Sequence, residues 1–359
     1  MPSPAGGHDY AKKAESAEST EEEEELQPLR QQRDNMEKCL LSIYSCKSDN
    51  NKFQFYTNLP NYEVFTALCK YLRGRALTYK YGFRKWKGIK HLEMRGSLSV
   101  SDASNRMLTF EEEFFIVLVK LKTGRMNQDL AYSFGVSTGF ISELMTTWLS
   151  FLSTELKMLF EMPDCDEAMR SDGVPAVFGK TAHLVAIIDC TELMLQKASD
   201  LHERKRTFSN YKNHDTVKFM VSMSPQLCVN YVSEAWGGRA SDRHITLSSR
   251  PFLDKLEPGS QVMADRGFTI SDELRSMGIK IIMPSFKGRG RSQMTPAECI
   301  HSQQVAKARI HIERIIQRIR TFHILASVVR LNQIDIIEQI FQVCAYLVNF
   351  QLPIIRSNE

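Results

Sequence analysis

Two aspartates each follow directly on an apolar segment of the 359-residue chain. Residues 184–188 are all apolar and lead into Asp189, while residues 262–264 lead into Asp265, which a glycine turn follows. Continuous apolar runs are typical of strands buried on both faces, so we predict that each aspartate ends a strand at the edge of a sheet. An unpaired buried carboxylate is costly, so it needs a cationic partner or a metal ion. The simpler alternative is a strand whose terminal aspartate meets solvent.

A third acid, Glu313, lies in a segment with the apolar periodicity of a helix, and it borders the apolar stripe. The stripe consists of Val305, Ala308, Ile312, Ile315, Ile319 and Phe322. Three converging carboxylates without a matching cation are most easily reconciled by a divalent metal ion, and oxygen ligands suit Mg²⁺ or Mn²⁺. The alternative is a simple ion pair between Glu313 and Arg309, which lies one helical turn earlier.

Five motifs between residues 180 and 350 occur in an order and spacing that resemble a known family. They are residues 187–192 (IIDCTE), 207–212 (TFSNYK), 236–242 (WGGRASD), 263–268 (MADRGF) and 309–314 (RIHIER). The region resembles the Harbinger-type DDE endonucleases and transposases, in the branch often fused to THAP zinc fingers. The resemblance implies an RNase H-like catalytic domain with Asp189, Asp265 and Glu313 as its catalytic, metal-binding triad.

The same resemblance implies cleavage of DNA, followed by attack of the freed 3′-hydroxyl on a second DNA. Two metal ions about 3.5–4 Å apart can activate the water and stabilise the charges that develop. Asp189 would bridge them, with Asp265 and Glu313 each holding one. Asp242 is either a fourth metal ligand or a structural hydrogen-bonding residue. The alternative function is a domesticated, non-catalytic DNA-binding protein derived from a transposase.

Charge and composition favour a polyanionic partner such as double-stranded DNA. Residues 1–26 contain eight acids and two lysines, a net charge of −6, so the rest carries +10 within an overall charge of +4. We expect no membrane span and no signal peptide, because neither apolar pattern occurs. The eight cysteines form no CxxC pair, which indicates free thiols in a reducing compartment and no zinc module. The expected location is the nucleus.

Basic residues that follow the predicted strand ending in Asp189 are predicted to contact DNA phosphates. They are Arg204, Lys205, Arg206, Lys212 and Lys218. A second basic stretch, residues 73–95, is interleaved with aromatic residues. It is interpreted as a linker whose aromatic residues pack on a neighbouring domain, or as a base-stacking segment, and its charges can also serve as a nuclear-import signal.

Residues 101–158 are predicted to form a helix-turn-helix, like the one that precedes the catalytic domain in the resembling transposases. A short helical segment, a glycine-bearing turn and a segment capped by Ser137 support this prediction. The last helix would offer Ser142 and Thr146 to a major groove. Its low positive charge leaves open the alternative of a plain three-helix support.

The pattern of strands after residue 180 is the one that an RNase H-like sheet requires. We expect strands at residues 184–189, 217–223 and 229–235, with alternating residues from 192 onward as a further strand. A helix then precedes the strand that ends in Asp265. The predicted fold class is α/β, an RNase H-like domain preceded by an all-α helix-turn-helix region and a disordered acidic tail.

The predicted domain limits divide the chain into four parts. Residues 1–25 form the acidic tail, which is too polar to fold. Residues 26–100 form a helical region with a possible short coiled coil and the basic linker. The helix-turn-helix follows at residues 101–158, and the DDE domain at residues 180–350. We expect a homo-oligomer, and a DNA-binding partner protein in place of the THAP zinc finger.

Overall fold

The computed structural model describes residues 27–28, 31, 41–78, 108–162, 174–175, 177–178, 183–197, 205–285 and 293–354. The predicted acidic tail and Arg204 lie outside these residues. The same holds for most of the predicted coiled coil and for the basic stretch beyond residue 78. Arg73 and Arg75, which we assigned to a linker, belong instead to a helix, Tyr62–Thr78.

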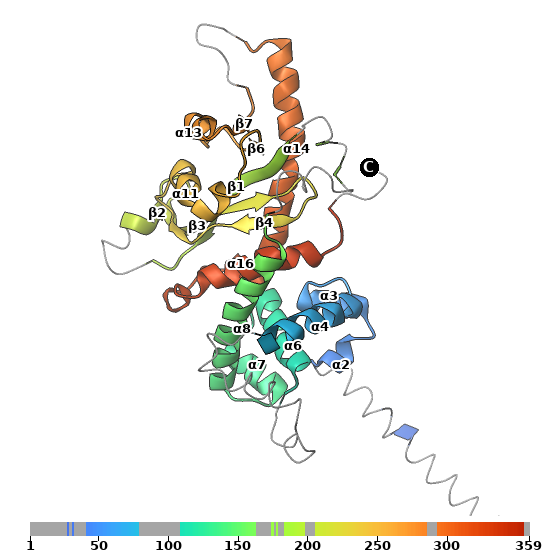
Figure 1. Ribbon diagram of the computed structural model, residues 1–359. Coiled ribbons are helices and arrows are strands. Elements are labelled where there is room, and N and C mark those ends of the chain that lie inside the picture. The colour runs from blue at the N-terminus through green and yellow to red at the C-terminus, as the bar shows by residue number, and fades with distance from the viewer. Residues whose placement is uncertain are drawn as a thin grey trace, which may run out of the picture.

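The first part of the described chain is helical and occupies the lower half of Figure 1. Its helices are α2 (Ile43–Cys46), α3 (Asn50–Thr57), α4 (Tyr62–Thr78), α6 (Phe110–Thr123), α7 (Asn127–Phe134) and α8 (Thr138–Leu159). A buried aromatic core holds them together, in which Phe114 stacks on Phe65 and on Trp148. Burial of each such ring contributes about 1.5–3 kcal/mol.

The helix-turn-helix is formed by α6, α7 and α8. Helix α6 begins at a capping box, in which the Thr109 hydroxyl accepts from the Glu112 N–H and the Glu112 carboxylate accepts from the Thr109 N–H. Helix α7 ends at Gly135, whose φ of 65° is a left-handed value that glycine adopts without strain. Ser137 caps α8 by accepting from the Phe140 N–H. The predicted helix-turn-helix is therefore confirmed.

A mixed, curled sheet forms the second part. Its strands are β1 (Leu184–Met194), β2 (Phe208–Ser209), β3 (His214–Met223), β4 (Val229–Val232), β5 (Trp236–Gly237), β6 (Gln261–Met263) and β7 (Lys280–Ile282). The order is β2-β3-β1-β6-β7, and β4 and β5 also pair with β3. Strands β1, β6 and β7 are parallel, whereas β3 is antiparallel to β1. This is the topology of an RNase H-like sheet, as predicted.

Strand β1 is longer than the sequence pattern suggested. We expected it to end at Asp189 and a new strand to follow from residue 192, but the strand runs without a break to Met194. The reason is its second neighbour, because β3 continues the antiparallel ladder from Ile187 to Met194 after β6 has ended. Asp189 therefore lies within a strand, just beyond the end of the neighbouring parallel strand.

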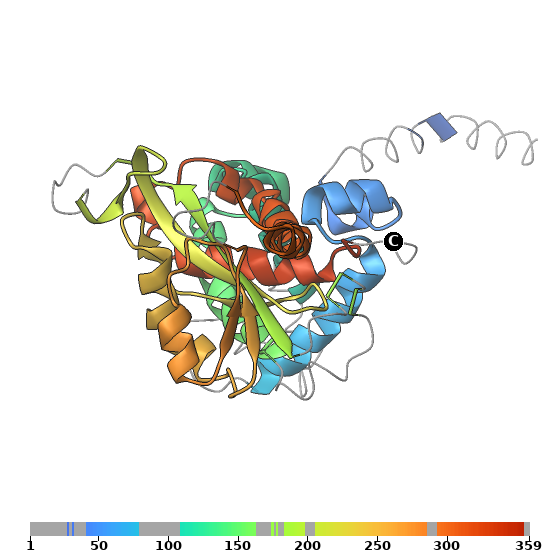
Figure 2. The ribbon, with the colours of Figure 1, turned by 90° about the horizontal axis from the view of Figure 1, so that it is seen from above.

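Helices cover both faces of the sheet (Figure 2). One face packs against α14 (Pro296–Arg320) and α16 (Ile337–Leu347), and the predicted stripe of α14 is buried there. The other face is covered by α11 (Asp242–Ser248), α12 (Arg250–Leu253) and α13 (Ser271–Ser276). The remaining short helices are α15 (His323–Ala326), η4 (Leu331–Gln333) and η5 (Val348–Phe350).

The helical part and the sheet share one core. Helix α8 packs against α16, and α6 packs against α15. Polar contacts reinforce this junction, because the Asn58 side-chain amide donates to the Thr321 hydroxyl and the Lys122 ammonium donates to the Thr321 carbonyl. Among the helices of the described ranges, none is long and apolar enough to cross a membrane.

Candidate active site

The register of the sheet brings the two aspartates to the same level. Ile187 of β1 lies opposite Met263 of β6 in the last pair of their parallel ladder. Asp189 lies two residues after Ile187, and Asp265 lies two residues after Met263. Because side chains alternate between the faces of a sheet, we expect Asp189 on the same face as Ile187 and Asp265 on the same face as Met263. Ile187 and Met263 are buried in the core that also contains α14. Both aspartates are therefore directed toward the side of the sheet on which α14 lies.

Helix α14 supplies Glu313 and the cation that joins the acids. The Arg309 Nη1 atom lies 3.0 Å from the Asp265 Oδ1 atom, and its Nη2 atom lies 3.8 Å from the Glu313 Oε1 atom. A single guanidinium thus contacts an acid from the sheet and an acid from its own helix. Asp189 is close enough to feel Arg309, Asp265 and Glu313 electrostatically. The structure therefore joins two of the three predicted acids through Arg309 and places Asp189 near them.

The carboxyl of Asp189 has a strongly perturbed pKa. Burial raises the pKa of its carboxyl from the ordinary 3.8 to about 6, because the charged form loses contact with water. Arg309 and the Cys190 N–H, which donates to Asp189 Oδ1 over 2.9 Å, lower this pKa, while Asp265 and Glu313 raise it. The site has more negative charge than Arg309 alone offsets, which is a condition that favours a further cation.

The three carboxylates of the site are chemically suited to bind a hard divalent cation. Three carboxylates from β1, the end of β6 and α14 are the oxygen ligands that Mg²⁺ and Mn²⁺ prefer. The side chains are nevertheless arranged around the guanidinium. Within the described ranges, no group of three His, Cys, Asp or Glu side chains is arranged to enclose a metal ion. The role of the three acids as metal ligands therefore stays a prediction.

Arg309 itself has an unfinished hydrogen-bond set. Its side chain is only 11% exposed, which is low for an arginine at the border of a site. Its Nε atom is buried and has no hydrogen-bond partner. A buried donor without a partner costs about 1–3 kcal/mol, so this guanidinium is not in its most favourable possible environment.

Asp242 lies on the other face of the sheet. It starts α11, and its Oδ1 atom lies 2.8 Å from the Lys218 Nζ atom. Lys218 also faces Glu192, its cross-strand neighbour, at 3.6 Å. The geometry favours the structural alternative for Asp242, whose role as a fourth metal ligand stays a prediction.

Lys218 does not fit its predicted contact with a phosphate. Its side chain is 13% exposed, and its ammonium group is committed to Asp242 and to the Ala240 carbonyl. Burial acts to lower the pKa of Lys218, but the hydrogen bond and the charge of Asp242 outweigh it, so this pKa is raised. Lys218 therefore joins α11 to the sheet.

The remaining predicted phosphate contacts lie on residues 205–215, a helical turn (residues 205–207) that leads into the β2–β3 hairpin, and we call this segment the basic hairpin. Lys205, Arg206 and Lys212 are exposed there, and the Lys212 ammonium lies 4.8 Å from the centre of the Tyr211 ring. The hairpin is held firmly, because the Thr207 hydroxyl donates to Asp215 over 3.0 Å. The structure thus presents these three cations on the surface of one segment that is tied to the sheet.

The two predicted groove-reading residues lie on the exposed face of α8. Ser142 and Thr146 are exposed, and the Thr146 hydroxyl donates to the Ser142 carbonyl over 3.1 Å. Their neighbours Ile141 and Leu144 are buried. This half of the helix is accessible, while the half nearer Leu159 packs against α16 of the second part of the chain.

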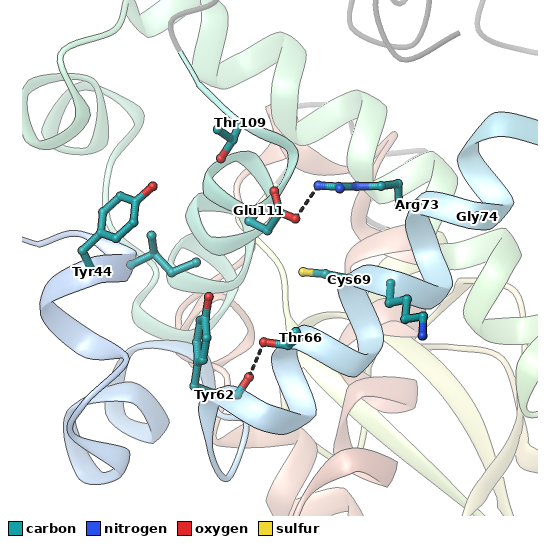
Figure 3. A pocket seen from close by; sticks show the side chains of 10 residues that line it. Tyr44, Tyr62, Thr66, Cys69, Arg73, Gly74, Thr109 and Glu111 are labelled. Carbon is teal, nitrogen blue, oxygen red and sulfur yellow. Dashed lines mark hydrogen bonds and ion pairs between the residues drawn. The ribbon is translucent and has the colours of Figure 1, made fainter. Parts of the chain in front are cut away.

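A separate cavity of about 560 Å³ lies in the helical part, between α2, α4 and the start of α6 (Figure 3). Tyr44 and Tyr62 line it on one side, and Cys69 and Arg73 on another. Arg73 is paired with Glu111 across the opening. The cavity lacks the group of acids found beside α14, so it is not the candidate for metal chemistry.

Comparison with known families agrees with this arrangement. Residues 188–349 match the family model described as DDE superfamily endonuclease, and residues 106–158 match the model described as helix-turn-helix of DDE superfamily endonuclease. The two matched segments support assignment to the DDE superfamily of transposases and endonucleases. A search of curated proteins found no match. The link to THAP-fused members stays a prediction.

The prediction from the sequence gave Arg309 too small a role. It considered Arg309 only as an ion-pair partner of Glu313, which lies four residues further along the helix. The stronger contact is with Asp265, from a distant part of the chain. The i, i+4 spacing of an arginine and a glutamate was a visible signal, but it could not reveal which acid the guanidinium would reach.

Proposed function

We propose that this chain binds double-stranded DNA and cleaves its phosphodiester bonds with the help of divalent metal ions. Asp189, Asp265 and Glu313 would be the ligands. The observation that carries the proposal is that Arg309 joins Asp265 to Glu313, while Asp189, on the neighbouring strand, is close enough to interact electrostatically with all three. The match to a DDE superfamily endonuclease supports the reaction class.

The three acids differ in what each can contribute. Divalent metal ions at such a site supply a deprotonated water and stabilise the charge on the scissile phosphate and the leaving oxygen. Asp189 is the more buried of the two aspartates and senses both other acids, which suits a shared, bridging ligand. Asp265 and Glu313 are half exposed and lie on either side of Arg309, which suits separate ligands.

Two surfaces support DNA binding. The basic hairpin offers three exposed cations for phosphate contacts, which position a protein on DNA without reading its sequence. The accessible half of α8 offers Ser142 and Thr146, which can contact base edges in a major groove. After cleavage, attack of the 3′-hydroxyl on a second DNA would complete transposition.

A non-catalytic DNA-binding protein is the second candidate. One observation favours it, since the acids are arranged around a guanidinium and not around a point suited to a metal ion. This candidate keeps the helix-turn-helix and the basic hairpin but assigns the acids to the stability of the fold.

A nicking assay separates the two candidates. The substrate is DNA that carries the terminal repeats of the source element, incubated with Mg²⁺ or Mn²⁺. The proposal expects strand cleavage by the parent protein, and a loss of several orders of magnitude in Asp189→Asn, because charge stabilisation of this kind is a large catalytic contribution. Parent protein that binds this DNA without cutting it under either metal would favour the second candidate.

The cellular setting is also part of the proposal. We expect the protein to act on chromosomal DNA in the nucleus, and the free cysteines of the described residues suit that reducing compartment. Joining two DNA ends favours a homo-oligomer, and a DNA-binding partner protein can supply the recognition that a THAP zinc finger gives in related proteins. Fluorescence localisation and light scattering are the direct tests.

A further inference from the structure

Arg309 lies on α14 between two of the three acids of the site. Its guanidinium lies 3.0 Å from Asp265 and 3.8 Å from Glu313, and its charge is also felt at Asp189. These are the oxygens that the proposed function assigns to metal ions. A ligand oxygen of Mg²⁺ must lie at about 2.0–2.1 Å from the ion, which leaves no room for a guanidinium in the same place.

The contacts of Arg309 are uneven. The bond to Asp265 has an ordinary length of 3.0 Å, whereas the contact with Glu313, at 3.8 Å, is long for a hydrogen bond, and the Nε atom has no partner. A guanidinium can satisfy all five of its donors only when more acceptors are within reach. A phosphate group is well suited, because its oxygens accept two parallel N–H bonds from one arginine.

We propose that Arg309 is the internal counter-ion of the acidic site. It competes with divalent metal for the oxygens of Asp265 and Glu313 until a DNA phosphate draws it away. This inference rests on the proposed function and adds a form of control to it. Metal binding and DNA binding therefore favour each other. A phosphate bound to Arg309 frees the carboxylates for metal, and metal bound to the carboxylates frees Arg309 for a phosphate.

The coupling follows from linkage. A DNA phosphate that binds Arg309 frees the two carboxylates, so it raises their affinity for metal by some factor, and metal must then raise the affinity for DNA by the same factor. The consequence is a site that fills with metal chiefly when substrate is present. Cleavage away from bound DNA would be suppressed by the chain's own cation.

Mn²⁺ binding, measured by electron paramagnetic resonance of the free ion, tests this inference. The measurement compares the full-length parent with Arg309→Gln, with and without a short duplex whose own Mn²⁺ binding is subtracted. Without DNA, Arg309→Gln should bind Mn²⁺ about tenfold more tightly, because a competing charged hydrogen bond is gone. DNA should tighten Mn²⁺ binding by the parent and do so much less in the variant.

The matched control is Arg320→Gln. Arg320 lies on the same helix, but its Nη2 atom donates to the Thr191 hydroxyl over 2.7 Å and to the Glu192 carbonyl. This variant should leave both the Mn²⁺ affinity and its response to DNA unchanged. If Arg309→Gln fails to fold by circular dichroism, Arg309→Lys keeps the charge without the forked geometry, and it should show an intermediate shift in the same direction.

Two failures can be told apart. Mn²⁺ binding that Asp189→Asn leaves unchanged would contradict the proposed function itself. Mn²⁺ binding that Asp189→Asn abolishes, but that Arg309→Gln leaves unchanged or weakens, would overturn only the role of Arg309. An unaltered effect of DNA on Mn²⁺ affinity in Arg309→Gln would also overturn it.

Discussion

The environment of the Asp189 carboxyl is unfavourable for its charged form, which has a cost for the stability of the fold. This carboxyl is partly buried between two other acids, and burial with this repulsion raises its pKa to about 6. The raised pKa means that the Asp189 carboxyl binds a proton more tightly in the folded protein than in the unfolded chain. At neutral pH the charged carboxylate therefore destabilises the fold unless a cation is bound, and Arg309 offsets this destabilisation only in part.

Asp189→Asn should stabilise the protein in the presence of a chelator. The shift in pKa from 3.8 to about 6 corresponds to about 1–3 kcal/mol above pH 6. Because this pKa is raised on folding, the parent loses stability as pH rises from about 4 to about 6, and Asp189→Asn does not. Denaturant unfolding at pH 4 and pH 7.5 measures the difference, which should be small at pH 4. A difference of equal size at both pH values would contradict the electrostatic explanation.

At the scale of elements, two glycines in β5 and the turn after it hold the basic hairpin against the sheet. A Cβ atom at Gly238 would lie 2.0 Å from the Thr216 hydroxyl and 2.7 Å from the Thr207 carbonyl. A Cβ atom at Gly237 would lie 2.2 Å from the Arg206 carbonyl. The motif at residues 236–242 therefore has a structural reason that is separate from metal binding, since only glycine permits this close approach.

Gly238→Ala should destabilise the fold by about 1–3 kcal/mol, because the added methyl group forces the hairpin or β3 to move. Thermal unfolding measures the effect, and binding to duplex DNA should weaken with it. Gly259→Ala is a control for loss of a glycine, since its added Cβ atom would meet nothing within 4 Å, although its φ of 96° brings strain of its own. A Gly238→Ala protein as stable as the parent would show that the hairpin is not held in this way.

Lys205→Ala combined with Arg206→Ala should weaken binding to all DNA sequences alike. Each lost phosphate contact reduces the slope of log K against log salt by about 0.9, so the pair should reduce it by roughly 1–2. Fluorescence anisotropy at several salt concentrations gives the slope. Lys280→Ala removes an exposed cation from β7, at the opposite edge of the sheet, and should change the slope less. An equal effect from both changes would mean that the hairpin holds no special place in DNA binding.

Ser142→Ala combined with Thr146→Ala tests whether α8 reads bases. Direct contacts to base edges are worth about 1–3 kcal/mol of discrimination, so their loss should change sequence preference more than overall affinity. Selection from a random DNA library gives the preference for parent and variant. Weaker binding with an unchanged preference would identify this helix as a support, the alternative that its low positive charge leaves open.

At the scale of the whole molecule, the two strands and the helix of the site were predictable, but their contacts were not. The apolar runs before Asp189 and Asp265 were sufficient to identify buried strands, because short runs bounded by a charge or a turn are typical of them. The extension of β1 depends on pairing with β3, and the contact between Arg309 and Asp265 depends on how α14 lies on the sheet. Both are tertiary effects that local sequence does not encode.

The shared core gives the molecule its functional geometry. Helix α8 lies with one half in the helix-turn-helix and the other half against α16, so the proposed reader of DNA and the acidic site are held in one structure. We infer that DNA bound at α8 would have a fixed relation to the site, as a nuclease that cuts at a set distance from its recognition sequence requires.

The central claim is that the three acids form one metal site, and anomalous diffraction from crystals soaked in Mn²⁺ tests it most directly. We expect anomalous peaks with oxygens of Asp189, Asp265 and Glu313 at about 2.0–2.6 Å, and the Arg309 guanidinium turned away from Asp265. Crystals of Asp189→Asn, soaked in the same way, should show weaker peaks or none. Parent crystals without a peak at these acids, and with the pair between Arg309 and Asp265 intact, would contradict the claim.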